Sequence, residues 1–248
     1  MITVAIPFYN TVDYLESLLA ELVDSFFVDE IVISNDASDY SIEIDHPKIT
    51  IYHNAVNQGA FRNKYLSVAR ASNDWVYLLD SDNKLPKSSI DILENIQDLD
   101  PDKYYSPIQL NLVNDGLDES LDGKKIVYNF PERTIDLELA KKYLDIAQKS
   151  NWTNNDYSVD WFLNTGNFLV NKKTYLETMK FIFDNPNHKH LEADAMAFTT
   201  HWLRKKKKIQ IVPDLCYEHR VRPQSYSHAL GSRGFESIQY HRKLLLQS

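Results

Sequence analysis

The sequence predicts an α/β protein with a central, mostly parallel sheet flanked by helices. Short apolar runs alternate with amphipathic stretches through the first half, and polar turn residues follow these runs. The 248 residues suffice for a sizeable core. Because no repeat, low-complexity tract or convincing linker interrupts the chain, the simplest organisation is one domain over residues 1–248.

The first half predicts four strands and two helices. The strands are expected at residues 2–8, 30–34, 48–52 and 75–79. One helix follows the first strand, because Leu15, Leu18, Leu22 and Phe26 recur at helical spacing. The other is expected at residues 59–71. This order is typical of an open α/β sheet, in which ligands bind outside the carboxyl ends of the strands.

The second half is less regular. It predicts strands near residues 104–113 and 124–130, helices near 135–148 and 172–183, and a hairpin or loop at 111–123. Residues 151–166 mix aromatic and polar side chains. This mixture suits a surface that packs against a sugar ring, but it also suits a plain ordered loop.

Composition limits the partners and the location. A net charge of −8 argues against a general nucleic-acid binder, although it permits one nucleotide held through a metal. Cys216 is the single cysteine, which excludes an intramolecular disulfide and fits a reducing compartment. The start lacks the features of a secretory signal and no apolar run approaches a membrane span, so we expect a cytoplasmic protein. The basic run 204–208 indicates a solvated helix end, with contact to an anionic membrane surface as the alternative.

Two acids follow the fourth predicted strand in the stretch "WVYLLDSDNKL". If the extended geometry continues past Leu79, Asp80 and Asp82 leave on the same face of the strand. Two like charges at such a short distance repel each other, and a divalent cation such as Mg²⁺ or Mn²⁺ would relieve the repulsion. The alternative is a solvated turn, because Asp, Ser and Asn favour turns for backbone reasons.

Further polar residues follow other predicted strands. Residues 35–39, "NDASD", can cap a helix or bind the hydroxyl and imide groups of a ligand. Residues 57–59 form a tight turn before the cations Arg62 and Lys64, an arrangement that suits a diphosphate and equally suits ordinary surface.

Taken in order, these segments resemble a known family. The segments "VAIPFYN", "ISNDASD", "NQGAFRN" and "LLDSDN" occur in the order and at the rough spacing of family 2 glycosyltransferases with the GT-A fold. The resemblance continues through "NTGNFLV", "LEADAMAFTTHWLRKKKKIQIVP" and "YEHRV" and so covers nearly the whole chain. It implies a nucleotide-sugar-binding half at residues 1–113 and an acceptor-binding half at 114–248. In this context the acidic pair is expected to bind metal.

The resemblance also implies roles for individual residues. Asp80 and Asp82 would form the metal-binding DxD element for Mn²⁺ or Mg²⁺, and His219 would supply a further ligand or be a structural histidine. Asp36 would accept a hydrogen bond from the base and Arg62 would lie near the diphosphate. The nucleotide-binding residues implied in this way are Pro7, Tyr9, Asp36, Arg62, Asp80 and Ser81.

The general base is assigned to one of two acids. Family members often have adjacent Glu and Asp at the start of a late helix, whereas Ala193 separates Glu192 from Asp194 here. On a helix these two side chains would point about 200° apart, so only one can face the cleft. Asp194 lies nearer the apolar stripe and is the preferred base. The alternative is that both acids only complement the helix dipole.

The implied reaction transfers a sugar, with inversion, from a nucleotide-diphosphate sugar to an acceptor hydroxyl. A UDP-sugar is the expected donor and a saccharide or glycoconjugate the expected acceptor, while the oligomeric state is not indicated. The candidate acceptor-binding residues are Trp161, Asn164, Thr165 and Gly166. In the tail, Arg220, Arg222 and His228 can fold over the diphosphate.

Two other classes stay open. A haloacid-dehalogenase-like phosphohydrolase also places Asp-x-Asp after an apolar strand, with the first acid as nucleophile, but its motif usually follows the first strand. A sugar-nucleotide-binding module without catalysis is the second alternative, and the separated Glu192 and Asp194 are its best support.

Overall fold

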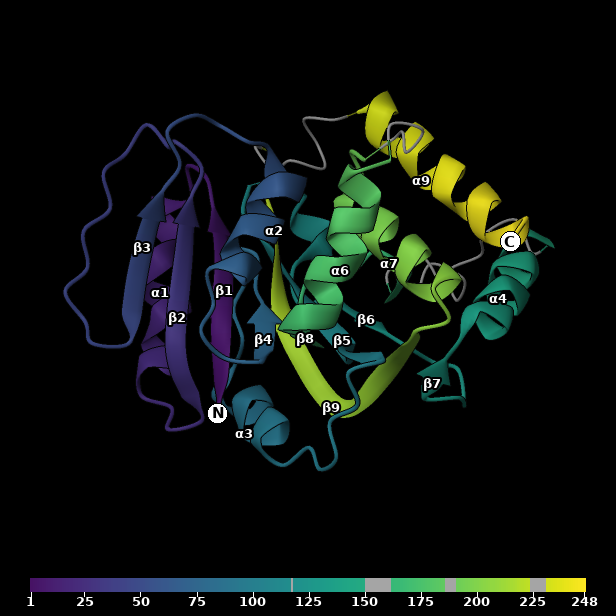
Figure 1. The fold of residues 1–248 in the computed structure, drawn as a ribbon, viewed down its shortest axis with the longest axis horizontal. Coiled ribbons are helices and arrows are strands. Elements are labelled where there is room, and N and C mark those ends of the chain that lie inside the picture. Colours follow the sequence, from purple (N-terminus) through teal and green to yellow (C-terminus); the bar gives the residue numbers. More distant parts are fainter. Residues whose placement is uncertain (117, 150–161, 186–190, 224–230) are drawn as a thin grey trace.

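A mixed β-sheet runs through the whole protein, with helices on both of its faces (Figure 1). The structure is a computed structural model that describes residues 1–116, 118–149, 162–185, 191–223 and 231–248. Within these residues the sheet has nine strands in the order β3-β2-β1-β4-β8-β5-β9-β7, with β6 paired to β5. The α/β class predicted from the sequence is confirmed.

The first four strands are parallel neighbours, as predicted. Their bounds are β1 (Ile2–Phe8), β2 (Val28–Asn35), β3 (Ile49–His53) and β4 (Trp75–Leu78). The helices that connect and follow them are α1 (Val12–Val23), α2 (Ala60–Ala69) and α3 (Lys87–Glu94). The predicted extension of α1 to Phe26 is wrong: α1 ends at Val23 and Phe26 is 95% exposed, so it takes no part in the apolar stripe.

The second half completes the sheet with both strand directions. Its strands are β5 (Lys103–Asn114), β6 (Lys125–Val127), β7 (Thr134–Ile135), β8 (Phe168–Asn171) and β9 (Lys208–Val221). β8 lies antiparallel between β4 and β5, whereas β5 and β9 are parallel. For residues 111–123 the sequence predicted a hairpin or a loop, and β5 and β6 form a hairpin there, with the short helix η1 (Glu119–Leu121) between them. The predicted boundary at residue 113 falls at the end of β5, and the division into two halves stays a prediction.

Two apolar clusters cover the two faces of the sheet. The alternation along β1 sends Ile2, Val4 and Ile6 into the cluster under α1 and α3, and Ala5 into the cluster under α2 and the later helices. The later helices are α4 (Leu137–Lys149), α6 (Lys172–Phe183), α7 (Asp194–Arg204) and α9 (Ser232–Leu246). In Figure 1, α2, α6 and α7 lie on one face and α1 on the other.

A bulge interrupts the pairing of the two longest strands. The register of β5 and β9 changes between Pro107, which pairs with Val212, and Gln109, which pairs with Cys216. Asp214, inside the extra loop of β9, adopts a positive φ of 62°. Because a bulge bends a strand and re-aims the residues beyond it, this one sets the direction of β9 from Cys216 onward. That part of β9 contributes to the site described below.

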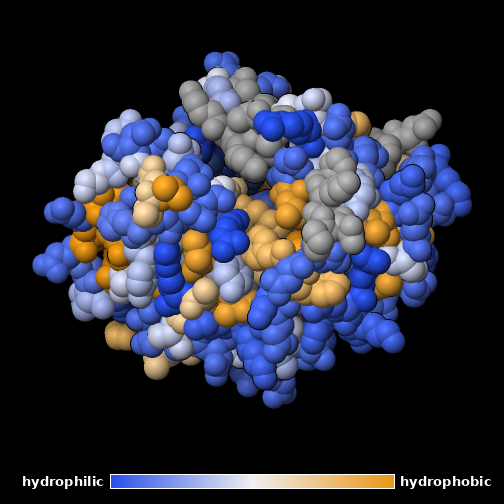
Figure 2. All heavy atoms as spheres, turned by 45° about the horizontal axis from the view of Figure 1, so that its top comes forward, coloured by the Kyte–Doolittle hydropathy of each residue, from blue (hydrophilic) through white to orange (hydrophobic). Residues whose placement is uncertain are grey.

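The face of the molecule drawn in Figure 2 is mainly hydrophilic. Figure 2 shows hydrophobic side chains reaching the surface near the middle of one face, while hydrophilic side chains cover most of the rest. Among the described residues, no helix combines the length and the apolar character that a membrane span requires.

Candidate active site at the carboxyl edge of the sheet

The two acids of the "LLDSDN" stretch lie in a tight turn directly after β4. The backbone N–H of Asn83 donates to the carbonyl of Asp80 over 3.0 Å, which closes the turn. The condition under which both acids would leave on one face of an extended strand is therefore not met, because the chain turns at Asp80. The turn is not simply solvated either: Ser81 is buried, and its hydroxyl accepts from Thr11 over 2.8 Å.

Strand β9 fixes this turn from the other side. Lys84 and Glu218 exchange backbone hydrogen bonds of 3.1 and 2.9 Å, and the N–H of Arg220 donates to Oδ1 of Asn83 over 3.1 Å. These contacts bring His219, which lies between Glu218 and Arg220, near the two acids. Burial lowers the pKa of His219, and the negative charges of Asp82 and Asp80 oppose this shift. Its lowered pKa favours the neutral imidazole that metal binding requires.

One buried lysine connects Asp80 to the candidate base. The Nζ atom of Lys64, on α2, lies 2.8 Å from Oδ1 of Asp80 and 2.9 Å from Oδ2 of Asp194. Burial by itself lowers the pKa of Lys64, but the charges of Asp194 and Asp80 and their hydrogen bonds outweigh burial, so its pKa is raised. The lysine is therefore charged at neutral pH. We call Lys64, Asp80 and Asp194 the Lys64 cluster.

A second cation holds the other acid. The Nε atom of Arg222, just beyond β9, lies 3.0 Å from Oδ2 of Asp82. Nε of Arg220 donates to the carbonyl of Asp82 over 3.2 Å. Both guanidinium groups lie over the ring of Tyr14 on α1, at 4.4 Å for Arg220 and 5.6 Å for Arg222. We call Arg222, Asp82, Arg220 and Tyr14 the Arg222 cluster.

The residues at this edge fit a divalent cation. Asp80, Asp82 and the neutral imidazole of His219 offer oxygen and nitrogen ligands, which suit Mn²⁺ and, for the carboxylates, Mg²⁺. Each of the two ion pairs uses one oxygen of its carboxylate, Oδ1 of Asp80 and Oδ2 of Asp82. Among the described residues, no three or more Asp, Glu, His or Cys side chains are arranged as a preformed metal site. Metal binding would therefore compete with Lys64 and Arg222 for the carboxylates.

Asp36 anchors the loop before α2. This buried carboxylate accepts from the backbone N–H of Gln58 over 2.8 Å, from Gly59 over 3.0 Å and from the side chain of Asn54 over 2.8 Å. Gly59, with φ of 82°, takes a backbone conformation that favours glycine. These hydrogen bonds show that Asp36 fixes the loop before α2. The predicted hydrogen bond between Asp36 and the base of a nucleotide stays a prediction.

The other residues predicted to bind nucleotide lie at or near the same edge. Pro7 pairs with Ser34 near the ends of β1 and β2, and Tyr9 just beyond β1 is 48% exposed. Arg62 differs: its guanidinium lies over the ring of Phe183, on α6, at 5.5 Å from the ring centre. It is Lys64, two residues later on α2, that reaches the acids. The sequence drew attention to both cations but did not indicate which one faces the acids.

Residues 164–167, of which 164–166 were predicted to bind the acceptor, hold other parts of the site in place. Oδ1 of Asn167 accepts from the backbone N–H of Asp80 over 2.8 Å, and Oδ1 of Asn164 accepts from the N–H of Met196 in the first turn of α7 over 3.0 Å. Thr165 is buried, with its hydroxyl 3.5 Å from that of Tyr217. Gly166 lies against the Lys64 cluster. Trp161, also predicted to bind acceptor, and His228 lie outside the described residues.

The two candidate bases are not on one helix. α7 begins at Asp194, so Glu192 precedes it, and the expected separation of about 200° around a helix does not apply. The start of α7 is fixed by α9, because the hydroxyl of Ser237 accepts from the N–H of Ala193 over 3.0 Å. Asp194 contacts Lys64, and through it lies close to Asp80. The choice of Asp194 over Glu192 as base stays a prediction.

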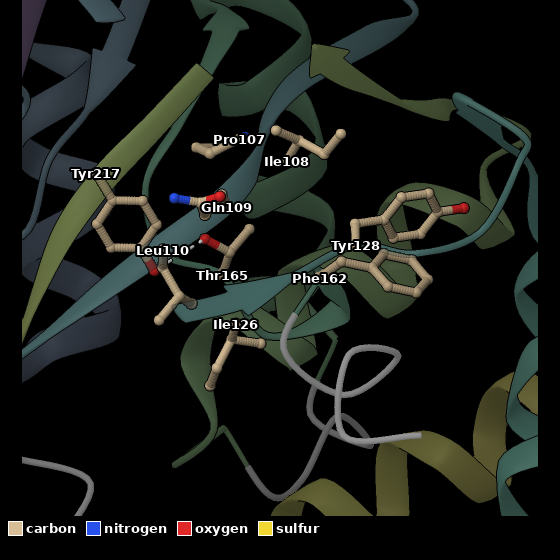
Figure 3. A pocket seen from close by; sticks show the side chains of 9 residues that line it. All are labelled: Pro107, Ile108, Gln109, Leu110, Ile126, Tyr128, Phe162, Thr165 and Tyr217. Atoms are coloured by element: carbon tan, nitrogen blue, oxygen red, sulfur yellow. Dashed lines mark hydrogen bonds between the residues drawn. The ribbon is translucent and has the colours of Figure 1, made fainter. Parts of the chain in front are cut away.

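A hollow lined by aromatic and apolar side chains lies beside this site, between β5, β6 and β9 (Figure 3). In Figure 3, Gln109 and Thr165 lie between Tyr217 and the rings of Tyr128 and Phe162. Those two rings meet edge to face at 5.2 Å. The lining residues are Pro107, Ile108, Gln109, Leu110, Ile126, Tyr128, Phe162, Thr165 and Tyr217. Thr165, which lines this hollow, directly precedes Gly166, which lies against the Lys64 cluster.

The sheet order, the acidic turn at its carboxyl edge and the helices on both faces define a GT-A type of α/β fold. The family model described as Glycosyl transferase family 2 matches residues 3–109. The resemblance to family 2 glycosyltransferases is therefore confirmed for this part of the chain. It favours the transferase class over the phosphohydrolase alternative.

Similar proteins agree with this class. Abequosyltransferase RfbV of Salmonella typhimurium is 36% identical over 115 residues, which are 42% of this chain and 34% of that protein, so the match spans about a third of the relative. A crystal structure of S. aureus TarS 1-349 in complex with UDP-GlcNAc has a TM-score of 0.56 and 14% identity, over 100% of this chain and 67% of that chain. Mannosyltransferase PcManGT of Pyrobaculum calidifontis, in complex with GDP-Man and Mn²⁺, has a TM-score of 0.57 and 14% identity, over 100% and 64%. These two structures support the fold.

Proposed function

We propose that this protein transfers a sugar from a nucleotide-diphosphate sugar to an acceptor hydroxyl, with inversion and with the help of a divalent metal ion. The observation that carries the proposal is the grouping at one sheet edge of Asp80, Asp82 and His219, with Asp194 joined to Asp80 through Lys64. Candidate metal ligands and a candidate base are thus brought together through one lysine. That arrangement suits the displacement of a diphosphate by a hydroxyl.

The donor would lie along the carboxyl ends of β1, β2 and β4. Asp36 and the loop it fixes, residues 54–59, would form the wall for the base, with Pro7 and Tyr9 beside them. Arg222 and Arg220 are already at the acidic turn, so they are placed to contact a diphosphate held there. Ser81, tied to Thr11, would keep the turn rigid beneath it.

Asp80, Asp82 and His219 would hold the metal ion. When bound, Mn²⁺ or Mg²⁺ supplies a Lewis acid that stabilises the charge of the departing diphosphate. This chain's own part is to present both carboxylates from one turn, fixed by Asn167 on one side and by Asn83 and β9 on the other. The neutral state favoured for His219 leaves a nitrogen lone pair for ligation.

Asp194 would remove the proton of the acceptor hydroxyl. Its position at the start of α7 is held by Ser237 and Asn164, so the carboxylate is carried on a fixed helix end. The acceptor would enter through the hollow beside Thr165, where aromatic faces and the amide of Gln109 suit a saccharide. A glycan or glycoconjugate is the proposed acceptor class.

The relatives guide the choice of donors to test. Their names and complexes include an abequosyltransferase, UDP-GlcNAc and GDP-Man with Mn²⁺. A UDP-sugar remains the proposed donor for this chain. The panel should therefore contain UDP-sugars first, together with GDP-Man and a nucleotide-activated abequose.

The test measures release of nucleoside diphosphate from this panel with and without Mn²⁺, for the wild type, Asp82→Ala and Asp194→Asn. A transferase releases the diphosphate only with metal, loses turnover in both variants and keeps donor binding best in Asp194→Asn. Metal-dependent donor binding without turnover in any acceptor mixture would instead indicate a binding module. Release of inorganic phosphate from simple monoesters would indicate a phosphohydrolase.

A further inference from the structure

Lys64 is a buried cation shared by two acids that have different roles in the proposed reaction. Its side chain is 11% exposed, and those of Asp80 and Asp194 are 27% and 15% exposed. A buried ammonium is costly unless charged partners compensate it, and here two carboxylates do so from two elements, the turn after β4 and the first residue of α7. The lysine thus joins the candidate metal site to the candidate base.

Space for this contact depends on a residue without a side chain. A Cβ atom at position 166 would lie 2.7 Å from Oδ2 of Asp80 and 2.8 Å from Nζ of Lys64, closer than such atoms approach. Gly166 has no positive φ, so its backbone conformation does not account for the glycine. The close approach of Lys64 and Asp80 explains why a glycine is needed at this position. The lysine contact is therefore built into a segment that also fixes Asp80 through Asn167 and α7 through Asn164.

The charge balance of the cluster determines how it treats a metal ion. Two carboxylate oxygens that each lie within 3 Å of one ammonium are themselves within about 6 Å of each other. With Lys64 charged, the cluster carries a net charge of −1, and without it the two acids would carry −2. A divalent cation near Asp80 is therefore repelled by Lys64 and must share the carboxylate with it.

We propose that Lys64 is a positioning residue that holds the Asp194 carboxylate in the site and competes with the divalent cation for Asp80. The inference rests on the proposed function, because it takes Asp194 as the base and Asp80 as a metal ligand. In the absence of metal, Lys64 compensates both acids. When metal occupies Asp80, the lysine stays with Asp194 and keeps it directed toward the acceptor.

This role predicts two effects of opposite sign when the charge is removed. Lys64→Met keeps an unbranched side chain of similar length and removes the ammonium. Because the competitor is gone, Mn²⁺ should bind about three- to tenfold more tightly. Because Asp194 loses its partner, kcat should fall about 10- to 100-fold, with a smaller change in KM for the donor. A merely structural role would weaken Mn²⁺ binding, turnover and stability together.

The experiment measures bound Mn²⁺ directly, by the loss of the free-ion EPR signal on titration, and steady-state kinetics in parallel. It uses the full chain as wild type, Lys64→Met, Lys64→Arg and Lys64→Gln, with folding checked by thermal unfolding. Lys84→Met is the matched control, because Lys84 is near the acidic turn but pairs with Glu21 at 3.5 Å. It removes one positive charge close by without touching either acid of the Lys64 cluster.

In Lys64→Met and Lys64→Gln we expect tighter Mn²⁺ binding together with slower turnover. In Lys64→Arg we expect near-wild-type Mn²⁺ binding and a kcat between those of the neutral variants and the wild type. Lys84→Met should change little. If Lys64→Met does not fold, Lys64→Gln decides, since it removes the charge and keeps a polar donor on a shorter side chain. Unchanged or weaker Mn²⁺ binding in the neutral variants overturns the inference, even while the wild type turns over. A wild type without turnover on any donor would instead count against the proposed function.

Discussion

The two carboxylates that flank Ser81 are each held by a cation, but the two cations come from different parts of the chain. Lys64 reaches Asp80 from α2, inside the first half, and also contacts Asp194. Arg222 reaches Asp82 from the end of β9, and its guanidinium lies over the ring of Tyr14. The tyrosine hydroxyl in turn donates to Asp115, just beyond β5.

Because of this difference, one turn can serve two purposes. The Lys64 cluster connects the turn to the candidate base, so its disturbance should appear mainly in the chemical step. The Arg222 cluster connects the turn to α1 and to the ends of β5 and β9, where the donor is proposed to lie, so its disturbance should appear mainly in donor binding.

The largest expected effect is at Asp194. Asp194→Asn should lower kcat by about 10²- to 10⁴-fold, because a general base is lost, while donor binding measured by calorimetry should change little. Glu192→Gln is the matched control and should retain most of the activity. The reverse pattern, with Glu192→Gln inactive and Asp194→Asn active, would move the base to Glu192 and separate the Lys64 cluster from the chemistry.

Gly166→Ala should be the next in size. Its new Cβ must push Lys64 and Asp80 apart, and both atoms are the ends of flexible side chains, so the protein should fold with a loss of about 1 to 3 kcal/mol. We expect kcat to fall about tenfold or more, because the contact between Lys64 and Asp80 is disturbed. Wild-type kinetics together with wild-type stability would show that the tight approach at position 166 has no consequence.

Arg222→Met should mainly affect the donor. We expect KM for the sugar nucleotide to rise about tenfold, with kcat within about threefold of the wild type, because a cation is lost where the diphosphate is proposed to lie. Lys205→Met is a suitable control, since the Lys205 ammonium also lies over an aromatic ring, that of Phe181, at 4.6 Å from the ring centre. A fall in kcat with unchanged KM would contradict the division between the two clusters.

The smallest expected effect concerns pH. The folded protein raises the pKa of Lys64, so the ammonium's contribution to stability is fully present below the unfolded-state pKa of about 10.5 and is lost only as pH rises through the higher folded pKa. The difference in unfolding free energy between the wild type and Lys64→Met should therefore stay constant from about pH 7 to about pH 10. Urea unfolding across this range measures it, and a difference that changes steadily with pH in this window would show that Lys64 is not the charged partner described.

Much of the fold follows from local patterns in the sequence. Apolar runs and helical spacing place the first four strands within a few residues, because these elements bury apolar faces. Sequence patterns did not predict features that depend on tertiary contacts. No periodicity showed that α1 ends before Phe26 or that β8 pairs antiparallel in the sheet. The latter depends on pairing between residues far apart in the chain.

The residue types of the candidate site could be predicted from the sequence, but their arrangement in space could be predicted only in part. The position of the acids after β4 was visible, but the turn at Asp80 depends on Asn83 and on β9, and the start of α7 at Asp194 depends on Asn164 and Ser237. The connection of Asp80 to Asp194 through Lys64 was not expected. The one sequence signal for this connection was Gly166, which lies between Thr165 and Asn167. A glycine can indicate a close approach, but it does not say which side chains approach it.

The most direct test is a crystal structure with Mn²⁺ and a donor that the protein turns over, with the metal located by its anomalous scattering. We expect the ion at Asp80 and Asp82 beside the diphosphate, with Arg222 moved from Asp82 toward the phosphates and Lys64 still on Asp194. An ion bound elsewhere, with Asp82 still paired to Arg222 and Asp80 to Lys64, would contradict this expectation.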